Sequence, residues 1–354
     1  MTQINWVLSF SISTILAIIG VPICRKVAVK TNFLDHPASH KQHSRSTPYL
    51  GGVAILFAVL IPIVIFHDTL HSAIVGTAIL ILFLVGLYDD KFTMPPSLKL
   101  FFQGIGAVLV FTVGFYLNAT GVLMHFVYSN WINLSITLIL FVLLPNSVNL
   151  LDNSDGLAAG VVGASCLGIL IESLLRAQHD LAIASAALLG ALVGFLAYNK
   201  KPASIFMGDA GSLPLGLILV ILASRSGGGL HTPQGALISL FYLAIPIADT
   251  VTVLIARVTN GRSIFQGGQD HLSHRISASG MSLGKSTLIL IGAQLALSTL
   301  AGLSASHAIS SWIAVALGPI ILAAIMAIAL RPSISDLVYR QKQILSTVPI
   351  DPGN

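Results

Sequence analysis

The chain has 354 residues, of which 55% are hydrophobic and only 9% charged, and its mean hydropathy is +0.89. This composition excludes an ordinary soluble or disordered chain and predicts an integral membrane protein. The net charge of +5 and the pI of about 9.3 would also suit a nucleic-acid partner, but the positions of the charges, described below, favour no nucleic acid.

Apolar runs of about 18 residues or more recur along the chain, as expected of transmembrane helices. We predict an all-α fold, a polytopic membrane helical bundle of eleven transmembrane helices; ten is the alternative, because the fifth and eighth runs are short. The first run has no basic start and no Ala-x-Ala-type cleavage site, which indicates a retained helix. The predicted spans are residues 4–24, 48–66, 71–88, 98–117, 133–148, 157–175, 181–198, 211–224, 234–256, 285–304 and 310–330.

Lys and Arg are divided unequally between the two sides of these spans. Of the 18 Lys and Arg residues, only Arg176 and Arg225 fall on one side, which leaves 16 on the other. The positive-inside rule then places the N-terminus outside and the C-terminus in the cytoplasm. Nine or ten of the 13 acidic residues also fall on the cytoplasmic side, depending on where Asp249 lies. Topology does not require this of acidic residues, so we expect the active face there.

No long linker and no evident repeat divides the chain. We therefore predict a single membrane domain over residues 1–354, with a short cytoplasmic tail at 331–354. Cys24 and Cys166 lie at or in predicted spans without a disulfide or CxxC pattern, which indicates buried structural thiols.

Two polar junctions come early in the chain. Residues 35–52 are basic, include Arg45 and end in Gly-Gly; contact with a phosphate or lipid headgroup and plain topological charge are equally consistent with them. Asp89 and Asp90 follow at the inner end of the third span. Adjacent ionised carboxylates repel, which favours a nearby cation. A solvated helix end is the alternative reading.

The third junction combines amides and carboxylates. Asn146, Asn149 and Asp152 recur every three residues, so on a helix they would share one face of its last turn, and Asp155 follows. Their neutral and anionic oxygens suit a metal ion or the ribose and amide groups of a substrate. Helix capping followed by an Asp-Gly turn is the alternative.

The fourth junction runs from Asn199 to Ser212 and places Asp209 in a Gly-flanked turn before a span. Glycine allows a close backbone approach to a phosphate, and the amides at a helix N-terminus favour an anion. Phe206 could stack on a base or could be a core aromatic.

The fifth junction contains His271, His274 and Arg275, which could bind a diphosphate. A His-x-x-His pair also suggests zinc, but no Cys or third fixed ligand is evident in the sequence. A polar loop without such a role is the alternative.

Together these motifs resemble the polyprenyl-phosphate N-acetylhexosamine-1-phosphate transferases, the glycosyltransferase family 4 enzymes of the MraY, WecA and TagO type, and in particular the WecA/TagO branch. The resemblance extends from about residue 32 to 276. It is carried by the Asp-Asp element, the Asn-x-x-Asn-x-x-Asp-x-x-Asp-Gly run and Phe-Met-Gly-Asp-x-Gly-Ser, which occur in the same order.

The resemblance implies a reaction. The enzyme transfers a HexNAc-1-phosphate from a UDP-sugar donor to undecaprenyl (polyprenyl) phosphate and releases UMP. GlcNAc-1-phosphate is the expected group. This step starts cell-envelope glycans such as lipopolysaccharide O-antigen or teichoic acid at the cytoplasmic face of the bacterial inner membrane. Mg²⁺ is the implied cofactor, Mn²⁺ could substitute for it, and a homodimer is a further expectation.

The resemblance also implies residue roles. The pair Asp89-Asp90 would engage the lipid phosphate, and Phe206 would stack on uracil. The metal would be held by Asp209 and Asn149. The expected catalytic residues are Asp89, Asp90, Asp152 and Asp209. The expected substrate-binding residues are Arg45, Asn146, Asn149, Asp155, Asn199, Phe206, His271, His274 and Arg275.

Two departures from the family pattern stand out. Ser273 replaces the middle histidine of the usual His-x-His-His motif, and Asp-Asn-Ser-Asp-Gly at 152–156 replaces Asp-Gly-Leu-Asp-Gly. The first departure argues against the alternative within the family, the phospho-MurNAc-pentapeptide transferase of peptidoglycan synthesis.

A transporter is the alternative from another class of protein. It would place its carboxylates near mid-span and show repeats in two halves. Among the carboxylates, only Asp249 lies about two turns inside a span, either supporting a site residue or packing against another helix. A catalytically inactive scaffold is a third reading, which the intact acidic motifs disfavour.

Overall fold

The computed structural model describes residues 2–35, 46–66, 73–113, 129–226, 233–263 and 268–330. Seven of the described helices are long and apolar enough to cross a membrane, and α2 and α4 are shorter apolar helices. The chain is therefore a multi-pass helical membrane protein. Its described elements are α1 (Thr2–Lys30), β1 (Leu34–Asp35), β2 (Thr47–Pro48), α2 (Gly51–Phe66), α3 (Ala73–Phe92), α4 (Pro96–Thr112), α6 (Ser129–Leu151), α7 (Leu157–Leu175), α8 (His179–Asn199), α9 (Asp209–Arg225), α10 (Pro233–Phe241), α11 (Ala244–Thr259), α12 (Leu272–Ala278), α13 (Leu283–Ala305) and α14 (Ser311–Ala329).

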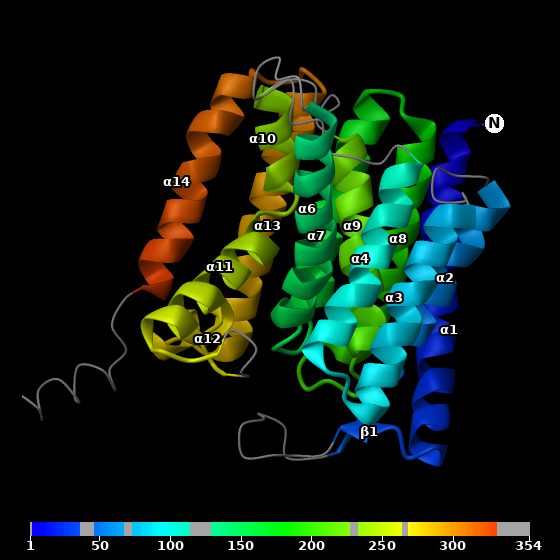
Figure 1. Ribbon diagram of the computed structural model, residues 1–354. Helices are drawn as coiled ribbons and strands as arrows, with labels where there is room; N and C mark the ends of the chain where they lie inside the picture. Colours follow the sequence, from blue (N-terminus) through cyan, green and yellow to red (C-terminus); the bar gives the residue numbers. More distant parts are fainter. Residues whose placement is uncertain are drawn as a thin grey trace, which may run out of the picture.

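Consecutive long helices run in opposite directions through the bundle (Figure 1). The helix α1 begins at the end opposite the small β1–β2 sheet, whereas α14 runs toward the end that carries that sheet (Figure 1). Arg176 and Arg225 cap or end α7 and α9. Both helices end away from the sheet, which agrees with the predicted division of charge. Which end faces the cytoplasm stays a prediction, as does the single-domain boundary, and the tail at 331–354 lies outside the described residues.

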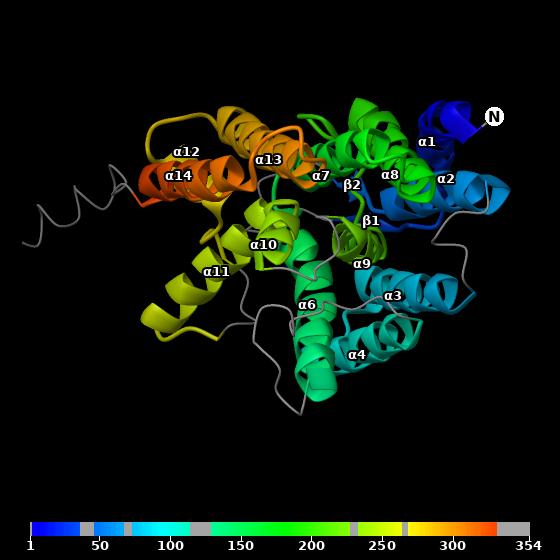
Figure 2. The ribbon, with the colours of Figure 1, turned by 90° about the horizontal axis from the view of Figure 1, so that it is seen from above.

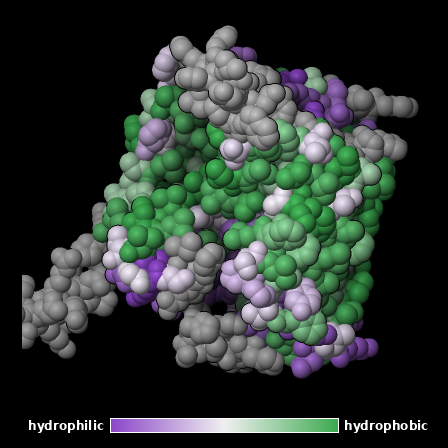
Figure 3. Space-filling model, viewed as in Figure 1, coloured by the Kyte–Doolittle hydropathy of each residue, from purple (hydrophilic) through white to green (hydrophobic). Residues whose placement is uncertain are grey.

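The helix α9 lies at the centre of the bundle. It packs against α2, α3, α6, α7 and α8, and Figure 2 shows it enclosed by them. Every residue from Ala210 to Ala223 is buried. The helices α1 and α14 lie at the periphery and expose apolar side chains such as Ile19 and Ile320. Figure 3 shows the same outward character, with hydrophobic surface along the helices and hydrophilic residues gathered toward the ends. The exposed apolar surface is suited to lipid.

The ninth predicted span, residues 234–256, is not one helix: α10 and α11 meet at a break after Phe241. The buried side chain of Gln294 from α13 satisfies the backbone there. Its Nε2 donates to the carbonyls of Phe241 (2.9 Å) and Tyr242 (3.2 Å), and its Oε1 accepts from the Ile245 amide (3.0 Å). Inside a bilayer no water could do this, so the break depends on a polar side chain from another helix. Beyond the break, α11 diverges from its neighbours (Figure 1).

Candidate active site

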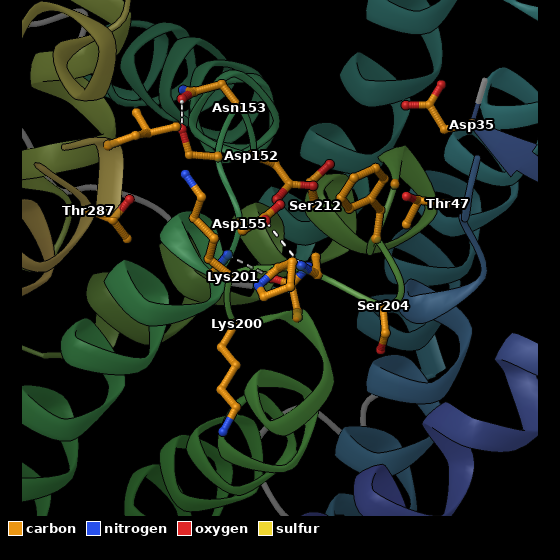
Figure 4. Close-up of a pocket in the computed structure, with 18 of the residues that line it drawn as sticks. Asp35, Thr47, Asp152, Asn153, Asp155, Lys200, Lys201, Ser204, Ser212 and Thr287 are labelled. Atoms are coloured by element: carbon orange, nitrogen blue, oxygen red, sulfur yellow. Dashed lines mark hydrogen bonds between the residues drawn. The ribbon is translucent and has the colours of Figure 1, made fainter. Parts of the chain in front are cut away.

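A cavity of about 1320 Å³ lies at the end of the bundle that carries β1 and β2. Asp35 and Thr47 of the sheet lie on one side of it and Thr287 of α13 on the other, with Asp152 and Asp155 between them (Figure 4). Its lining brings together the third, fourth and fifth polar junctions: Asn149, Asp152, Asp155, Phe206, Asp209 and His274. The lining also includes the cations Arg25, Lys200 and Lys201.

Backbone pairing fixes the loop that precedes α9. The Phe206 amide donates to the Pro48 carbonyl (2.8 Å), and the amides of Gly51 and Gly52 donate to the carbonyls of Phe206 and Met207, both at 3.0 Å. A Cβ on either glycine would overlap backbone atoms of the opposite segment. The Gly-Gly pair is therefore needed for this close approach, which holds the Phe206–Asp209 loop against the start of α2.

Two aromatic rings stand at the sheet end of the cavity. Tyr49 and Phe206 both line it, with ring centroids 6.1 Å apart and planes inclined by 58°. Burial, reinforced by the charge of Asp35, raises the pKa of Tyr49 well above its ordinary value, so its phenol stays neutral. The pair could accommodate a flat heterocycle beside a neutral hydroxyl group.

Asp90 caps the N-terminus of α9. Its Oδ1 accepts from the Asp209 amide (2.8 Å) and its Oδ2 from the Ala210 amide (3.0 Å). Gly208, just before them, has φ 66° and ψ −177°, a conformation nearly restricted to glycine. A Cβ there would overlap the Asp90 carboxylate, and one on Gly86 would overlap the Asp209 backbone. Asp90 is thus committed to holding Asp209 in place.

Lys99 of α4 joins two of the carboxylates. Its Nζ donates to Asp89 Oδ2 at 2.8 Å and to Asp209 Oδ2 at 2.6 Å, and the other Asp89 oxygen accepts from the Met94 amide. The sequence reasoning missed Lys99. One signal was present: a cation in the first turns of a helix that begins at Pro96 opposes the helix dipole, which indicates a carboxylate nearby.

The predicted triplet of the third junction is divided in the structure. Asn149 and Asp152 line the cavity. Asn146 instead donates to Gln103 Oε1 and to the Val142 carbonyl, so it ties α6 to α4. The three-residue spacing placed these side chains near one face of α6, but the neighbouring α4 contacts that face at Asn146.

Asn199 and Asp155 join two loops of the site. Asn199 Oδ1 accepts from the Gly156 amide (3.0 Å) and its Nδ2 donates to the Ile205 carbonyl (2.9 Å), while Asp155 Oδ2 accepts from the Ala203 amide (3.0 Å). Asn199 is only 2% exposed. Both residues also line the cavity, but the buried Asn199 amide is used in hydrogen bonds within the protein.

Asp249 of α11 supports the histidine segment. Its Oδ2 lies 2.9 Å from His271 Nδ1, and its Oδ1 accepts from the Leu272 amide at 2.7 Å. Asp249 is fully buried. Of the two readings of Asp249, support for a site residue is therefore the one that the contacts favour.

The remaining basic residues differ in where they lie. His274 lines the cavity, and its ring centroid is 6.0 Å from that of His271. Burial, followed by the neighbouring His271, lowers the pKa of His274, which keeps it neutral near pH 7. Arg275 Nε donates to the Asp270 carbonyl (3.0 Å) in its own segment. Arg45 lies outside the described residues.

The carboxyl groups of Asp152, Asp155 and Asp209 meet at the cavity. Burial and the charges of Asp209, Asp90 and Asp155 raise the pKa of Asp152 well above its ordinary value. Within the described ranges, no group of three or more His, Cys, Asp or Glu is arranged to hold a metal. Mg²⁺ commonly uses one or two carboxylates together with substrate phosphates, so the hard oxygen donors of Asp209 and Asn149 fit it chemically.

Comparison with known proteins identifies the family. Residues 72–227 match glycosyl transferase family 4. A protein of Bacillus subtilis (strain 168) named "Probable undecaprenyl-phosphate N-acetylglucosaminyl 1-phosphate transferase" is 32% identical over 295 residues, which cover 81% of this chain and 82% of that protein. The chain belongs to glycosyl transferase family 4.

Other relatives of this family 4 glycosyl transferase carry two kinds of name. The undecaprenyl-phosphate alpha-N-acetylglucosaminyl 1-phosphate transferase of Escherichia coli (strain K12) is 26% identical over 307 residues, 82% of this chain and 81% of the relative. A phospho-N-acetylmuramoyl-pentapeptide-transferase of Streptococcus gordonii is 32% identical over 292 residues, 76% of this chain and 86% of the relative.

Proposed function

We propose that this family 4 glycosyl transferase moves GlcNAc-1-phosphate from UDP-GlcNAc to undecaprenyl phosphate and releases UMP. The observation that carries the proposal is the meeting of Phe206, Asp152 and Asp209 in one cavity, with Lys99 bound to Asp209 behind them. A flat base, a diphosphate and a metal ion each find suitable chemistry there. The names of the relatives in Bacillus subtilis and Escherichia coli support the same transferred group and lipid acceptor.

Mg²⁺, or Mn²⁺ in its place, would be held by Asp209 and Asn149. When bound, the cation offsets negative charge on the phosphoryl oxygens. It would also offset the carboxylates around the cavity, which repel a diphosphate donor and a phosphate acceptor. Two unit charges about 4 Å apart interact by about 4 kcal/mol at a partly shielded site.

Lys99 holds Asp89 and Asp209 together and presents a cation to the reacting phosphates. An ammonium group has three N–H donors, and these two carboxylates accept two of them. The third can donate to a phosphate oxygen of the acceptor. Asp90 acts indirectly in this scheme, because both of its oxygens receive α9 amides and thereby orient Asp209.

The two ends of the donor would be recognised by different chemistry. Phe206 would stack on uracil, with the neutral Tyr49 hydroxyl nearby. His274, neutral near pH 7, would hydrogen-bond to the diphosphate or sugar from the α12 side.

The decisive experiment uses purified protein in detergent with undecaprenyl phosphate, Mg²⁺ and either UDP-GlcNAc, another UDP-HexNAc or UDP-MurNAc-pentapeptide. We expect lipid-dependent UMP release with UDP-GlcNAc. Release only with UDP-MurNAc-pentapeptide would establish the alternative that the Streptococcus gordonii relative represents. Absence of release with every donor, from protein with a sharp melting transition, would reject the transferase proposal and return the transporter to consideration.

We further propose that the cavity faces the cytoplasm across the bacterial inner membrane. The exposed Lys200 lies at the cavity, and the exposed Asp180 lies in the first turn of α8 at the opposite end of the bundle. In a chain with Cys24 and Cys166 replaced by Ala, a membrane-impermeant maleimide should label Asp180→Cys in intact cells and label Lys200→Cys only after lysis. The reverse pattern would invert the topology. The proposed homodimer is tested by multi-angle light scattering, where the mass of one chain would reject it.

A further inference from the structure

The short helix α12 is attached on two different sides. On one side His271 and the Leu272 amide bind the buried Asp249 of α11, at 2.9 and 2.7 Å. On another side the Ser273 hydroxyl donates to Asn153 Oδ1 at 2.7 Å. Ser273 is fully buried. A seven-residue helix has little stability by itself, so its position depends on contacts such as these.

Asn153 is itself held in one orientation. It lies in the turn between Asp152 and Asp155, beside the cavity (Figure 4). Its Nδ2 donates to the Leu150 carbonyl (2.9 Å), and its Oδ1 accepts from the Ser154 hydroxyl (2.9 Å) as well as from Ser273. The amide is thereby fixed with its oxygen toward α12.

Both residues belong to the two departures from the family pattern that the sequence shows. Asn153 belongs to the altered Asp-Asn-Ser-Asp-Gly run, and Ser273 stands in place of the middle histidine. They lie 120 positions apart and form one hydrogen bond. Each departure therefore supplies the partner that the other needs, a donor for an acceptor.

We propose that Asn153 and Ser273 are a matched positioning pair that sets the distance between the Asp152–Asp155 turn and His274, and with it the fit of the donor's phosphate and sugar end. The inference rests on the proposed function for the identity of that donor. His274 follows Ser273 directly and lines the same cavity as the turn. Movement of α12 away from the turn would withdraw His274 from a ligand, although every group that contacts the ligand would still be present.

A double-mutant cycle tests the pair, with Asn153→Ala, Ser273→Ala and the double variant. Loss of the hydrogen bond should raise KM for UDP-GlcNAc by about fivefold to tenfold in each single variant, with kcat within about twofold. Asn153→Ala also removes the bonds to Leu150 and Ser154, so the double variant should show nearly the same KM as Asn153→Ala alone, with no added effect from Ser273→Ala. Ser277→Ala is the matched control, since its hydroxyl donates to the Met281 carbonyl within its own segment.

Two further measurements separate positioning from general stability. The dissociation constant of UDP-GlcNAc, measured by calorimetry without lipid, should rise together with KM. The melting temperatures of the Asn153→Ala and Ser273→Ala variants should be no lower than that of Ser277→Ala. Ser273→Thr keeps the hydroxyl and should have a KM close to that of wild type. If Ser273→Thr has a lowered melting temperature, Asn153→Asp, which keeps an acceptor oxygen, serves as the conservative variant instead.

Unchanged KM and dissociation constant, or additive effects in the double variant, would overturn the pair. So would a fall in kcat that merely follows a lower melting temperature. Wild-type protein that binds UDP-GlcNAc without turnover would reject the proposed reaction, while the dissociation constants would still decide the pair. Wild-type protein that does not bind it would overturn both.

Discussion

Lys99 and Asp209 are 110 positions apart in the chain, and their side chains form an ion pair with Nζ and Oδ2 separated by 2.6 Å. The same ammonium binds Asp89, so one cation from α4 links α3 to α9. Both side chains are partly buried: Lys99 is 19% exposed and Asp209 is 21% exposed. An ion pair shielded to this extent is less screened by salt than one on the surface.

Lys99→Met should abolish most activity, because it removes the cation between two carboxylates and leaves them to repel each other. We expect a loss of about a hundredfold or more in kcat/KM, comparable to removal of one preorganised charge from an active site. UMP release under saturating Mg²⁺ measures it. The control is Lys91→Met, an exposed lysine in the last turn of α3, which should retain activity. Equal activity of the two variants would remove Lys99 from the mechanism.

Asp209→Asn should reduce transfer to below about 1% of wild type while the protein still melts cooperatively. The amide keeps the size of the side chain but loses the charge expected to hold Mg²⁺. Chelation of the wild-type protein should have the same effect and be reversed by Mg²⁺. Asp180→Asn, an exposed aspartate in the first turn of α8, is the matched control. Near-normal turnover of Asp209→Asn would contradict the metal role.

Phe206→Ala should weaken use of the donor mainly through KM. Stacking on a base contributes about 1–3 kcal/mol, which corresponds to a KM rise of about fivefold to 150-fold, and it should act equally in the ground and transition states. Phe206→Tyr should retain most of the affinity. Phe101→Ala, on the exposed surface of α4, serves as control. A fall in kcat with unchanged KM would rule out the stacking assignment.

Asp152 makes a prediction about pH. Its raised pKa means that the folded protein retains a proton that the unfolded chain has already lost above the ordinary value of 3.8. Stability must therefore fall as the pH rises from that value through the folded-state pKa. Asp152→Asn removes this penalty, so it should melt at a higher temperature than wild type at pH 8, with the difference shrinking toward pH 4. It should also be inactive. A lower melting temperature at pH 8 would contradict the electrostatic account.

Gly208→Ala should destabilise the site. The backbone conformation at Gly208 costs a non-glycine residue about 1–3 kcal/mol, and the added Cβ would overlap the Asp90 carboxylate. Both the melting temperature and kcat should fall, because the cap on α9 and the position of Asp209 are disturbed together. Gly76→Ala, where a Cβ meets nothing within 4 Å, should be neutral or slightly stabilising. Equal melting of the two variants would refute the constraint.

The helices were predictable because hydropathy is a local property of the sequence. The break between α10 and α11 was only partly predictable: Pro246 favours the first turn of a new helix, but Gln294, which satisfies the broken backbone, lies on another helix 53 positions from Phe241. The run 234–256 gave no local sign of this partner. A continuous apolar segment is consistent with either one helix or two when the missing backbone bonds are supplied from elsewhere.

The site was predictable in its residue types and less so in their division of labour. Asp89 and Asp90 are equivalent in the sequence, yet the N-terminus of α9 binds one and Lys99 binds the other. Asn146 lies three residues before Asn149 in the sequence, but its side chain donates to Gln103 of α4. In each case the deciding partner comes from a different helix, so the pattern within one segment could not reveal it.

The central position of α9 has a consequence for how the protein is made. The helices α2, α3, α6, α7 and α8 that surround it all precede it in the chain, whereas α10, which also packs against it, follows. Chains emerge from the ribosome N-terminus first, at about 5–20 residues per second. Asp209 can therefore reach Asp90 and Lys99 as soon as α9 is inserted, before α12 has been synthesised. Biogenesis would thus complete the acidic half of the active site first and add the histidine half afterwards.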